Sequence, residues 1–320
     1  MKNDDTRNIK ILNPKNQLEL YGFDDYFHSF VKLFKKNKLP NAILLNGSKG
    51  LGKSTFAYHF INFMLSHEQK NKYSLEDFSI NYENKGYKSL CDNTNPNFFL
   101  LDKGEEEDSI KIELSRNLLK FLNKSTYQNN MKIILIDNAE FLNINAANAL
   151  LKAIEEPSEN TFFFIVSNSN ANILDTIKSR CVEFNFFLSI EKKKDIFNKL
   201  IKIYSSSIDQ YVDDKFFVET PGNILRYLEI LDFKIEHLKK NTPDLIIHLI
   251  DKYKQKKENM ILSFITFLIE MHYNELSFAN KSLEMHYNNK FNLLNKMNEV
   301  KKFNLDKKNL FTSIEGLFNK

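Results

Sequence analysis

Apolar residues in the first 190 positions alternate between short continuous runs and helical spacings. The runs are 41–46, 98–101, 133–137 and 161–167, and each predicts a buried strand. The helical spacings fall within 18–35, 55–65, 110–122 and 146–155. Residues 66–97 are polar and irregular, which indicates a surface insertion. Alternating strands and helices predict an α/β domain in which a parallel sheet carries helices on both faces.

Strand signals largely cease after Phe187. The later helical spacings lie at 190–204, 211–218, 223–231, 245–253 and 260–271. We therefore predict three domains: an α/β domain over residues 1–187, an all-α domain over 188–238 and a second all-α domain over 239–320. A chain of 320 residues fits this number, because it exceeds one ordinary compact core.

The segment Gly47-Ser-Lys-Gly-Leu-Gly-Lys53-Ser54 is a complete phosphate-binding loop placed between a predicted strand and a predicted helix. Gly47, Gly50 and Gly52 would let backbone N–H groups approach an anion. Lys53 would then reach the β- and γ-phosphates of ATP, with Thr55 beside it at the helix start. Ser54 and Asp137, at the end of the strand 133–137, would ligate Mg²⁺.

The residue after Asp137 is Asn138, whose amide cannot accept a proton from water at neutral pH. Glu140 lies two positions further on, and we expect it to point elsewhere in the turn. The site is therefore predicted to bind ATP and to hydrolyse it weakly or not at all.

Composition and charge bear on the partners, the location and the metal content of the protein. A formal charge of +4 and a pI near 8.7 are compatible with a nucleic-acid partner without demanding one. No apolar run approaches the ~20 residues that a bilayer span needs, and the N-terminus leads into no apolar signal segment. We expect a cytoplasmic protein. The two cysteines, Cys91 and Cys181, cannot make a four-cysteine zinc site, so no zinc is expected.

Three segments resemble the AAA+ subunits of the bacterial sliding-clamp loader: Leu39–Lys53, Asn148–Pro157 and Leu174–Cys181. The resemblance covers residues ~18 to ~190 well and the later helices only in outline. It implies that the first domain is an AAA+ P-loop domain, the second a lid and the third a collar for oligomerisation. It also implies that Arg180, in the triplet Ser179–Cys181, is an arginine finger acting on the ATP of an adjacent subunit.

The chain departs from the ATP-hydrolysing gamma/tau members at several places. Asn138 stands where they carry a glutamate, and Leu225 stands where they carry an arginine, which here comes one position later at Arg226. Of the family's four-cysteine zinc module only Cys91 remains. The resemblance also suggests, weakly, a sensor role for Ser167 or Asn168.

The resemblance therefore implies a clamp-loader subunit with a mainly mechanical role. Its partners would be the gamma/tau and delta subunits of DNA polymerase III and, through the complex, the sliding clamp and primed DNA. An active gamma/tau-type ATPase is the first alternative, and a stand-alone P-loop ATPase is the second. A size measurement would separate these interpretations, because a collar domain should drive assembly with gamma and delta partners, whereas a stand-alone ATPase should turn over ATP alone.

Overall fold

The computed structural model describes residues 11–67, 69, 71–103, 107, 109–124, 131–169, 173–204, 212–233, 238, 241–278, 283–303 and 305–318. The chain divides into two compact units. One consists of Leu12–Leu200 with Thr220–Gly222, and the other of Ile201–Glu219 and Asn223–Lys320 with Met1–Ile11. The division falls within helix α7 (Ile190–Tyr204).

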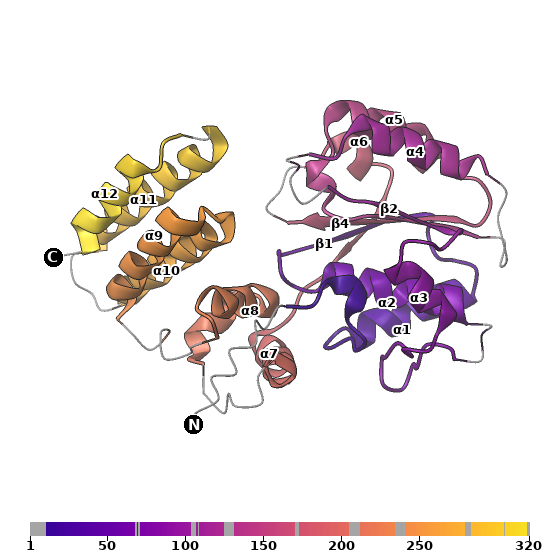
Figure 1. Cartoon of the computed structure of the whole chain (residues 1–320), viewed down its shortest axis with the longest axis horizontal. Helices are drawn as coiled ribbons and strands as arrows, with labels where there is room; N and C mark the ends of the chain where they lie inside the picture. The colour runs from indigo at the N-terminus through magenta and orange to yellow at the C-terminus, as the bar shows by residue number, and fades with distance from the viewer. Residues whose placement is uncertain are drawn as a thin grey trace, which may run out of the picture. The chain divides into compact units, whose positions relative to one another are not determined.

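The first unit contains a five-stranded sheet in the order β2-β3-β4-β1-β5 (Figure 1). All neighbouring strands are parallel. The strands are β1 (Ala42–Gly47), β2 (Phe98–Leu101), β3 (Lys132–Ile136), β4 (Thr161–Asn168) and β5 (Val182–Asn185). Because parallel strands end at one edge of the sheet, the ends of β1, β3 and β4 can bring polar residues together there.

In the described part of this unit, helices lie on both faces of the sheet (Figure 1). On one face are α1 (Asp24–Lys35), α2 (Lys53–Ser66) and α3 (Lys85–Cys91), and on the other are α4 (Ile112–Leu122), α5 (Ile144–Glu155) and α6 (Asp175–Lys178). Successive strand residues alternate between the two cores, as Ile43 packs with α1 and α2 whereas Leu44 packs with α4 and α5. The predicted α/β fold with helices on both faces is confirmed.

Two local predictions for this unit are corrected. The strand β5 was not expected, and its residues lack the continuous apolar run that marks the other four. The segment 66–97 is not merely a polar insertion, because it contains α3 and buries four large side chains against the core. These are Tyr73, Ile80, Tyr87 and Leu90.

In the second unit the described residues form helices only. They are the last residues of α7 (201–204), a short 3₁₀ helix (Asp214–Val218), α8 (Pro221–Ile230, whose first two residues belong to the other unit), α9 (Thr242–Lys256), α10 (Asn259–Phe278), α11 (Leu283–Phe303) and α12 (Lys308–Phe318). Tyr227 stacks on Phe264 with ring centroids 4.2 Å apart, which joins α8 to α10. The predicted helical character of this region is confirmed. Its separation into a lid and a collar at residue 238 stays a prediction.

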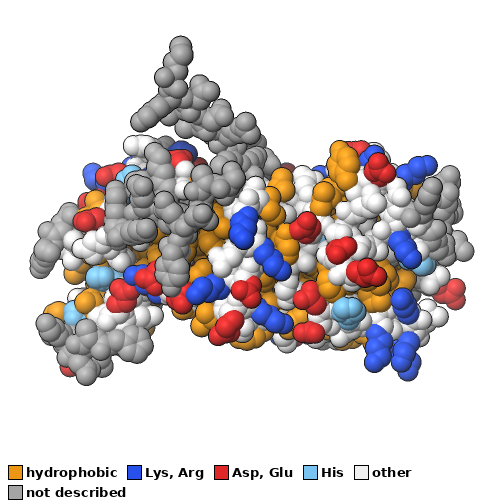
Figure 2. Space-filling model, turned by 90° about the horizontal axis from the view of Figure 1, so that it is seen from below, with side chains coloured by type: hydrophobic (Ala, Val, Ile, Leu, Met, Phe, Trp, Pro, Cys, Tyr) orange, Lys and Arg blue, Asp and Glu red, His pale blue; other side chains and the backbone are white. Residues whose placement is uncertain are grey.

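The surface carries charges of both signs. On the face shown in Figure 2, Lys and Arg side chains are interspersed with Asp and Glu and with hydrophobic side chains. Within the described ranges, no helix is both long enough and apolar enough to span a bilayer.

Candidate functional site

The phosphate-binding loop connects β1 to α2, as the sequence predicts. Gly50 and Gly52 have φ angles of +78° and +102°, in the left-handed region that favours glycine. At Gly47 a Cβ atom would lie 2.9 Å from the carbonyl oxygen of Phe186, so close approach of the chain excludes a side chain there. The loop therefore needs glycine for two different reasons, backbone angle and space.

Lys53 begins α2 and is almost fully buried, with 4% of its surface exposed. Its Nζ donates to the carbonyl oxygens of Gly47 and Ser48, both at 2.8 Å, and to Oδ1 of Asn168 at 3.2 Å. Burial lowers the pKa of Lys53 to about 8, although the charges of Glu140 and Asp137 act in the opposite direction. The ammonium is thus held at the loop by acceptors that an anionic ligand could replace.

Ser54 and Asp137 meet across 83 residues of sequence. The Ser54 hydroxyl donates to Oδ1 of Asp137 at 2.7 Å, which joins the first turn of α2 to the end of β3. Burial raises the pKa of Asp137 to about 6, and the hydrogen bond from Ser54 opposes that shift. The two predicted Mg²⁺ ligands are therefore adjacent, while Thr55 follows them on α2 and is half-buried.

The turn after β3 places Glu140 in the site, contrary to the expectation that it points elsewhere. Asn138 adopts the left-handed conformation with φ +59°, and a 3₁₀ turn (Ala139–Phe141) begins at once. The carboxylate of Glu140 accepts a hydrogen bond from Nδ2 of Asn168. Its charge acts on both Lys53 and Asp137. Asparagine tolerates the left-handed region better than most residues, and Asn138 is the sequence signal that could have indicated this sharp turn.

Asn168, at the end of β4, is the residue that links these groups. Its side chain accepts from Lys53 and donates to Glu140. Ser167 is buried, and its hydroxyl donates to the carbonyl oxygen of Asn168 at 3.4 Å. Of the two residues suggested for a sensor role, Asn168 is therefore the one whose side chain lies at the phosphate-binding loop.

The start of α8 also touches the phosphate-binding loop, a contact that sequence reasoning missed. The Thr220 hydroxyl donates to the carbonyl oxygen of Lys49 at 2.7 Å, and the Gly222 N–H donates to that of Gly50 at 3.0 Å. A Cβ atom on Gly222 would lie 2.5 Å from the Gly50 carbonyl oxygen. The sequence indicated only a break between helices at 220–222. Within α8, Leu225 is buried and Arg226 is exposed.

Arg180 lies between α6 and β5. Its Nε donates to Oε2 of Glu155 at 2.9 Å, and its Nη1 donates to the carbonyl oxygen of Thr176, also at 2.9 Å. The side chain keeps 30% of its surface exposed. Arg180 belongs to the same unit as the phosphate-binding loop but is not among the residues that contact Lys53, Ser54 or Asp137 in the described part of the chain.

The cysteines have separate surroundings. The Cys91 thiol donates to the carbonyl oxygen of Lys15 at 3.6 Å. Cys181 packs half-buried against the core under α4 and α5, and burial raises its pKa to about 11. Among the described residues no group of three or more His, Cys, Asp or Glu side chains is arranged to hold a metal ion.

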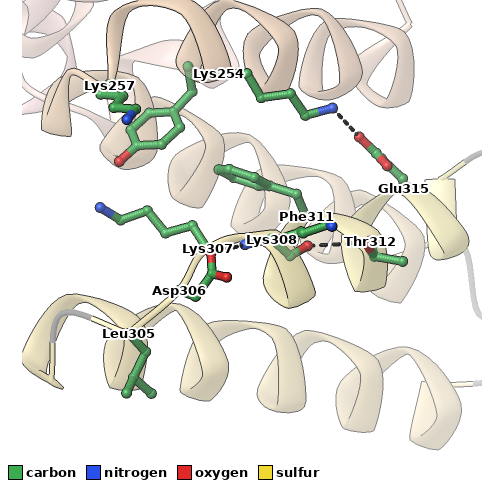
Figure 3. Close-up of a pocket in the computed structure, with 10 residues that line it drawn as sticks. Lys254, Lys257, Leu305, Asp306, Lys307, Lys308, Phe311, Thr312 and Glu315 are labelled. Atoms are coloured by element: carbon green, nitrogen blue, oxygen red, sulfur yellow. Dashed lines mark hydrogen bonds and ion pairs between the residues drawn. The ribbon is translucent and has the colours of Figure 1, made fainter.

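A pocket of about 650 Å³ lies in the second unit, between α9 and the segment leading into α12 (Figure 3). Lys254 spans it by donating to Glu315 at 3.0 Å, and it also contacts Asp251 at 3.1 Å. Lys307 lies over the ring of Tyr253, with 5.3 Å from its Nζ to the ring centroid. None of the residues predicted to bind phosphate or Mg²⁺ lines this pocket.

The part of the chain that carries this site matches a known protein family. The family model described as DNA polymerase III, delta subunit, matches residues 23–188, just over half of the chain. The chain belongs to this family. The matched range contains the phosphate-binding loop, Asp137, Asn168 and Arg180.

Several curated relatives of this chain carry the name DNA polymerase III subunit delta', which agrees with the family match. The DNA polymerase III subunit delta' of Pseudomonas aeruginosa is 35% identical over 143 residues, covering 45% of this chain and 42% of that protein. The subunit delta' of Buchnera aphidicola subsp. Schizaphis graminum is 27% identical, covering 61% of this chain and 60% of that protein. The resemblance to the clamp-loader family, and within it to the delta' branch, is confirmed.

The gamma subunits are related as well. The DNA polymerase III subunit gamma of Buchnera aphidicola subsp. Acyrthosiphon pisum is 29% identical, covering 70% of this chain and 64% of that protein. The alignments span roughly half of the length of the delta' relatives. A gamma subunit-related protein from Thermotoga maritima aligns over 91% of this chain and 98% of its own, with 18% identity and a TM-score of 0.47. A likeness at that level carries no functional argument.

Proposed function

We propose that this chain acts as a delta'-type clamp-loader subunit that binds ATP with Mg²⁺, hydrolyses it weakly or not at all, and provides Arg180 to a neighbouring subunit. The observation that carries the nucleotide part is the convergence of Lys53, Ser54 and Asp137 at the edge of the sheet. Lys53 and Ser54 are consecutive, whereas Asp137 lies 83 residues after Ser54, and the chemistry of the three groups suits a phosphate chain and its metal ion.

The donor set fits ATP and Mg²⁺. The backbone at Gly47, Gly50 and Gly52 would surround the phosphates, Lys53 would exchange its carbonyl partners for phosphate oxygens, and Ser54 and Asp137 would hold the metal ion. Bound Mg²⁺ would supply positive charge that offsets the charge of the β- and γ-phosphates. The burial of Asp137 favours this, because a cation restores the charged form that burial disfavours.

Two features of the site support the proposal that ATP hydrolysis is weak or absent. Asn138 is neutral and cannot act as a general base at physiological pH. Glu140 is close, but one carboxylate oxygen accepts from Asn168, and Oε2 is shielded from solvent without a hydrogen-bond partner among the described residues. A base must contact the attacking water, and in this arrangement one oxygen of Glu140 already accepts from Asn168 while the other is shielded from solvent.

The proposed assembly follows from family membership. The gamma/tau and delta subunits would be the partners, the helices of residues 239–320 would form the collar that joins them, and the complex would open and load the sliding clamp on primed DNA. Arg180 supports this role because its guanidinium is partly exposed and is not used by the chain's own phosphate-binding loop. A planar, permanently charged group suits stabilisation of a transferring phosphoryl group.

Reconstitution with gamma and delta subunits tests the proposal. The purified chain should bind MgATP in calorimetry, lose binding in Lys53→Ala, and show background ATPase. In the complex, Arg180→Ala should lower clamp- and DNA-stimulated ATPase while assembly on size-exclusion chromatography is unchanged. Loss of an arginine finger slows the affected site by roughly 10³-fold or more, so the total rate should fall to that of the other sites.

The same experiment identifies either alternative. Robust turnover by the chain alone, abolished by Lys53→Ala, would indicate an active ATPase: a gamma/tau-type subunit if the chain also assembles with gamma and delta, and a stand-alone P-loop ATPase if it does not. Glu140→Gln would then show whether Glu140 replaces the missing glutamate, because glutamine keeps the shape of the side chain and removes its basic oxygen. Undetectable nucleotide binding, or wild-type clamp loading by Arg180→Ala, would contradict the corresponding half of the proposal.

A further inference from the structure

The orientation of the Arg180 guanidinium is set by two acceptors on different segments. Glu155, the last residue of α5, binds the Nε–H, and the carbonyl oxygen of Thr176 in α6 binds one N–H of Nη1. A guanidinium has five N–H groups in one plane. Two of them are engaged, one on Nε and one on Nη1, and the remaining three, including both on Nη2, have no partner within the described part of the chain.

The ion pair between Glu155 and Arg180 contributes little to folding stability. The Glu155 side chain is 56% exposed, and exposed ion pairs contribute roughly 0–1 kcal/mol. Its effect is geometric, because the bonds to Glu155 and to Thr176 hold one rigid plane and so fix the orientation of the Nη2 group. The next residue, Glu156, is a useful contrast, since it is also exposed and its carboxylate has no ion-pair or hydrogen-bond partner among the described residues.

We propose that Glu155 is a positioning residue for Arg180. It holds the Nε–H of the guanidinium so that the Nη2 group stays available to an anionic phosphate oxygen bound by a neighbouring subunit. This inference rests on the proposed function, in which Arg180 acts in trans. Glu155 touches no substrate in this role. It reduces the conformational freedom that Arg180 would otherwise lose when the neighbouring nucleotide reacts.

The test compares five variants in the complex reconstituted with gamma and delta subunits, clamp and primed DNA: Arg180→Ala, Glu155→Ala, Glu155→Gln, Glu156→Ala and the double variant Glu155→Ala/Arg180→Ala. The quantity compared is the Arg180-dependent ATPase rate, which is the rate of the wild-type complex minus the rate of the Arg180→Ala complex. Glu155→Ala should reduce this rate by about tenfold through kcat, within the range known for misplaced catalytic groups, with the KM for ATP unchanged.

Three further results are expected. Glu155→Gln should retain more of the Arg180-dependent rate than Glu155→Ala, because its amide oxygen still accepts from Nε–H. Glu156→Ala should match wild type. The double variant should be no slower than Arg180→Ala alone, since Glu155 acts only through Arg180. Thermal unfolding and size-exclusion profiles should be the same for all five variants, which excludes a folding defect as the cause.

The outcomes separate the two proposals. If Arg180→Ala leaves the rate unchanged, the finger assignment fails, and the positioning role fails with it. If Arg180→Ala lowers the rate but Glu155→Ala equals Glu156→Ala, the finger stands and the positioning role of Glu155 is wrong. A faster rate in Glu155→Ala would also overturn it, because it would show that Glu155 restrains Arg180 instead of positioning it.

Discussion

Lys53 shows how burial modifies a residue that the sequence motif already identifies. The motif predicts that its ammonium faces phosphate, but the motif does not predict its pKa. In the fold Lys53 is almost completely removed from solvent, and the pKa falls to about 8. The free protein therefore loses the charge of Lys53 at a mildly alkaline pH, well below the pH at which an exposed lysine would lose it.

The first prediction is that MgATP binding weakens as pH rises through 8. Phosphate binds the charged form of Lys53, which is roughly nine-tenths populated at pH 7 and one-tenth at pH 9 for a pKa of about 8. The Kd should rise about tenfold over this range. Calorimetry at pH 7, 8 and 9 in buffers of different ionisation enthalpy should also detect proton uptake at the higher pH values.

Lys53→Arg is the control for this titration, because guanidinium remains charged throughout. If that variant binds MgATP measurably, its Kd should not show the tenfold rise between pH 7 and pH 9 that is expected for the wild-type protein. An equal rise in both proteins would assign the pH dependence to another group.

At the scale of elements, the unexpected feature is the contact between the start of α8 and the phosphate-binding loop. Two donors, the Thr220 hydroxyl and the Gly222 N–H, bind successive carbonyl groups of the loop. The loop conformation thus depends on a segment about 170 residues later in the chain. This dependence could not be read from the loop motif, which describes only local backbone requirements.

The second prediction concerns Gly222→Ala. Alanine normally stabilises a helix relative to glycine, yet here its Cβ would lie 2.5 Å from the carbonyl oxygen of Gly50. Because that atom is backbone, the loop must shift, and we expect a loss of roughly 1–3 kcal/mol in the free energy of unfolding. Weaker MgATP binding should accompany it. Chemical denaturation and calorimetry measure the two effects.

Gly316→Ala is a matched control on α12. Apart from its chain neighbours and the backbone of its own helix, no atom of the described residues lies within 4 Å of the position that its Cβ would occupy, so the substitution should stabilise the protein by up to ~1 kcal/mol and leave nucleotide binding unchanged. If Gly222→Ala behaved like Gly316→Ala, the close approach of α8 to the loop would not be a feature of the protein in solution.

At the scale of the whole molecule, a third prediction concerns metal content. The chain should be purified without a structural zinc ion, because a single thiol in the segment of Cys91 cannot make a tetrahedral site. Metal analysis of protein prepared without chelators should give well below one zinc per chain. About one equivalent, lost in Cys91→Ser, would show that other ligands complete a site.

Residue patterns alone predict the layered α/β domain, the helical region after it and the residues of the phosphate-binding loop. Continuous apolar runs bounded by helical spacings leave few alternatives to a parallel sheet, and the spacing of glycines with Lys53 and Ser54 defines the loop locally. These patterns do not reveal β5, whose four residues are partly exposed at the sheet edge and lack an apolar run. Nor do they reveal how residues 66–97 pack on the core.

Which polar groups meet depends on the fold. The strand order places the ends of β1, β3 and β4 side by side, so Asn168 reaches Lys53 and Glu140 although 115 and 28 residues separate them in the chain. A left-handed turn at Asn138 returns Glu140 to the site, and the packing of α5 beside α6 brings Glu155 to Arg180. Such contacts depend on backbone direction and strand order, which local residue patterns do not encode, because each pattern describes one element and each contact joins two.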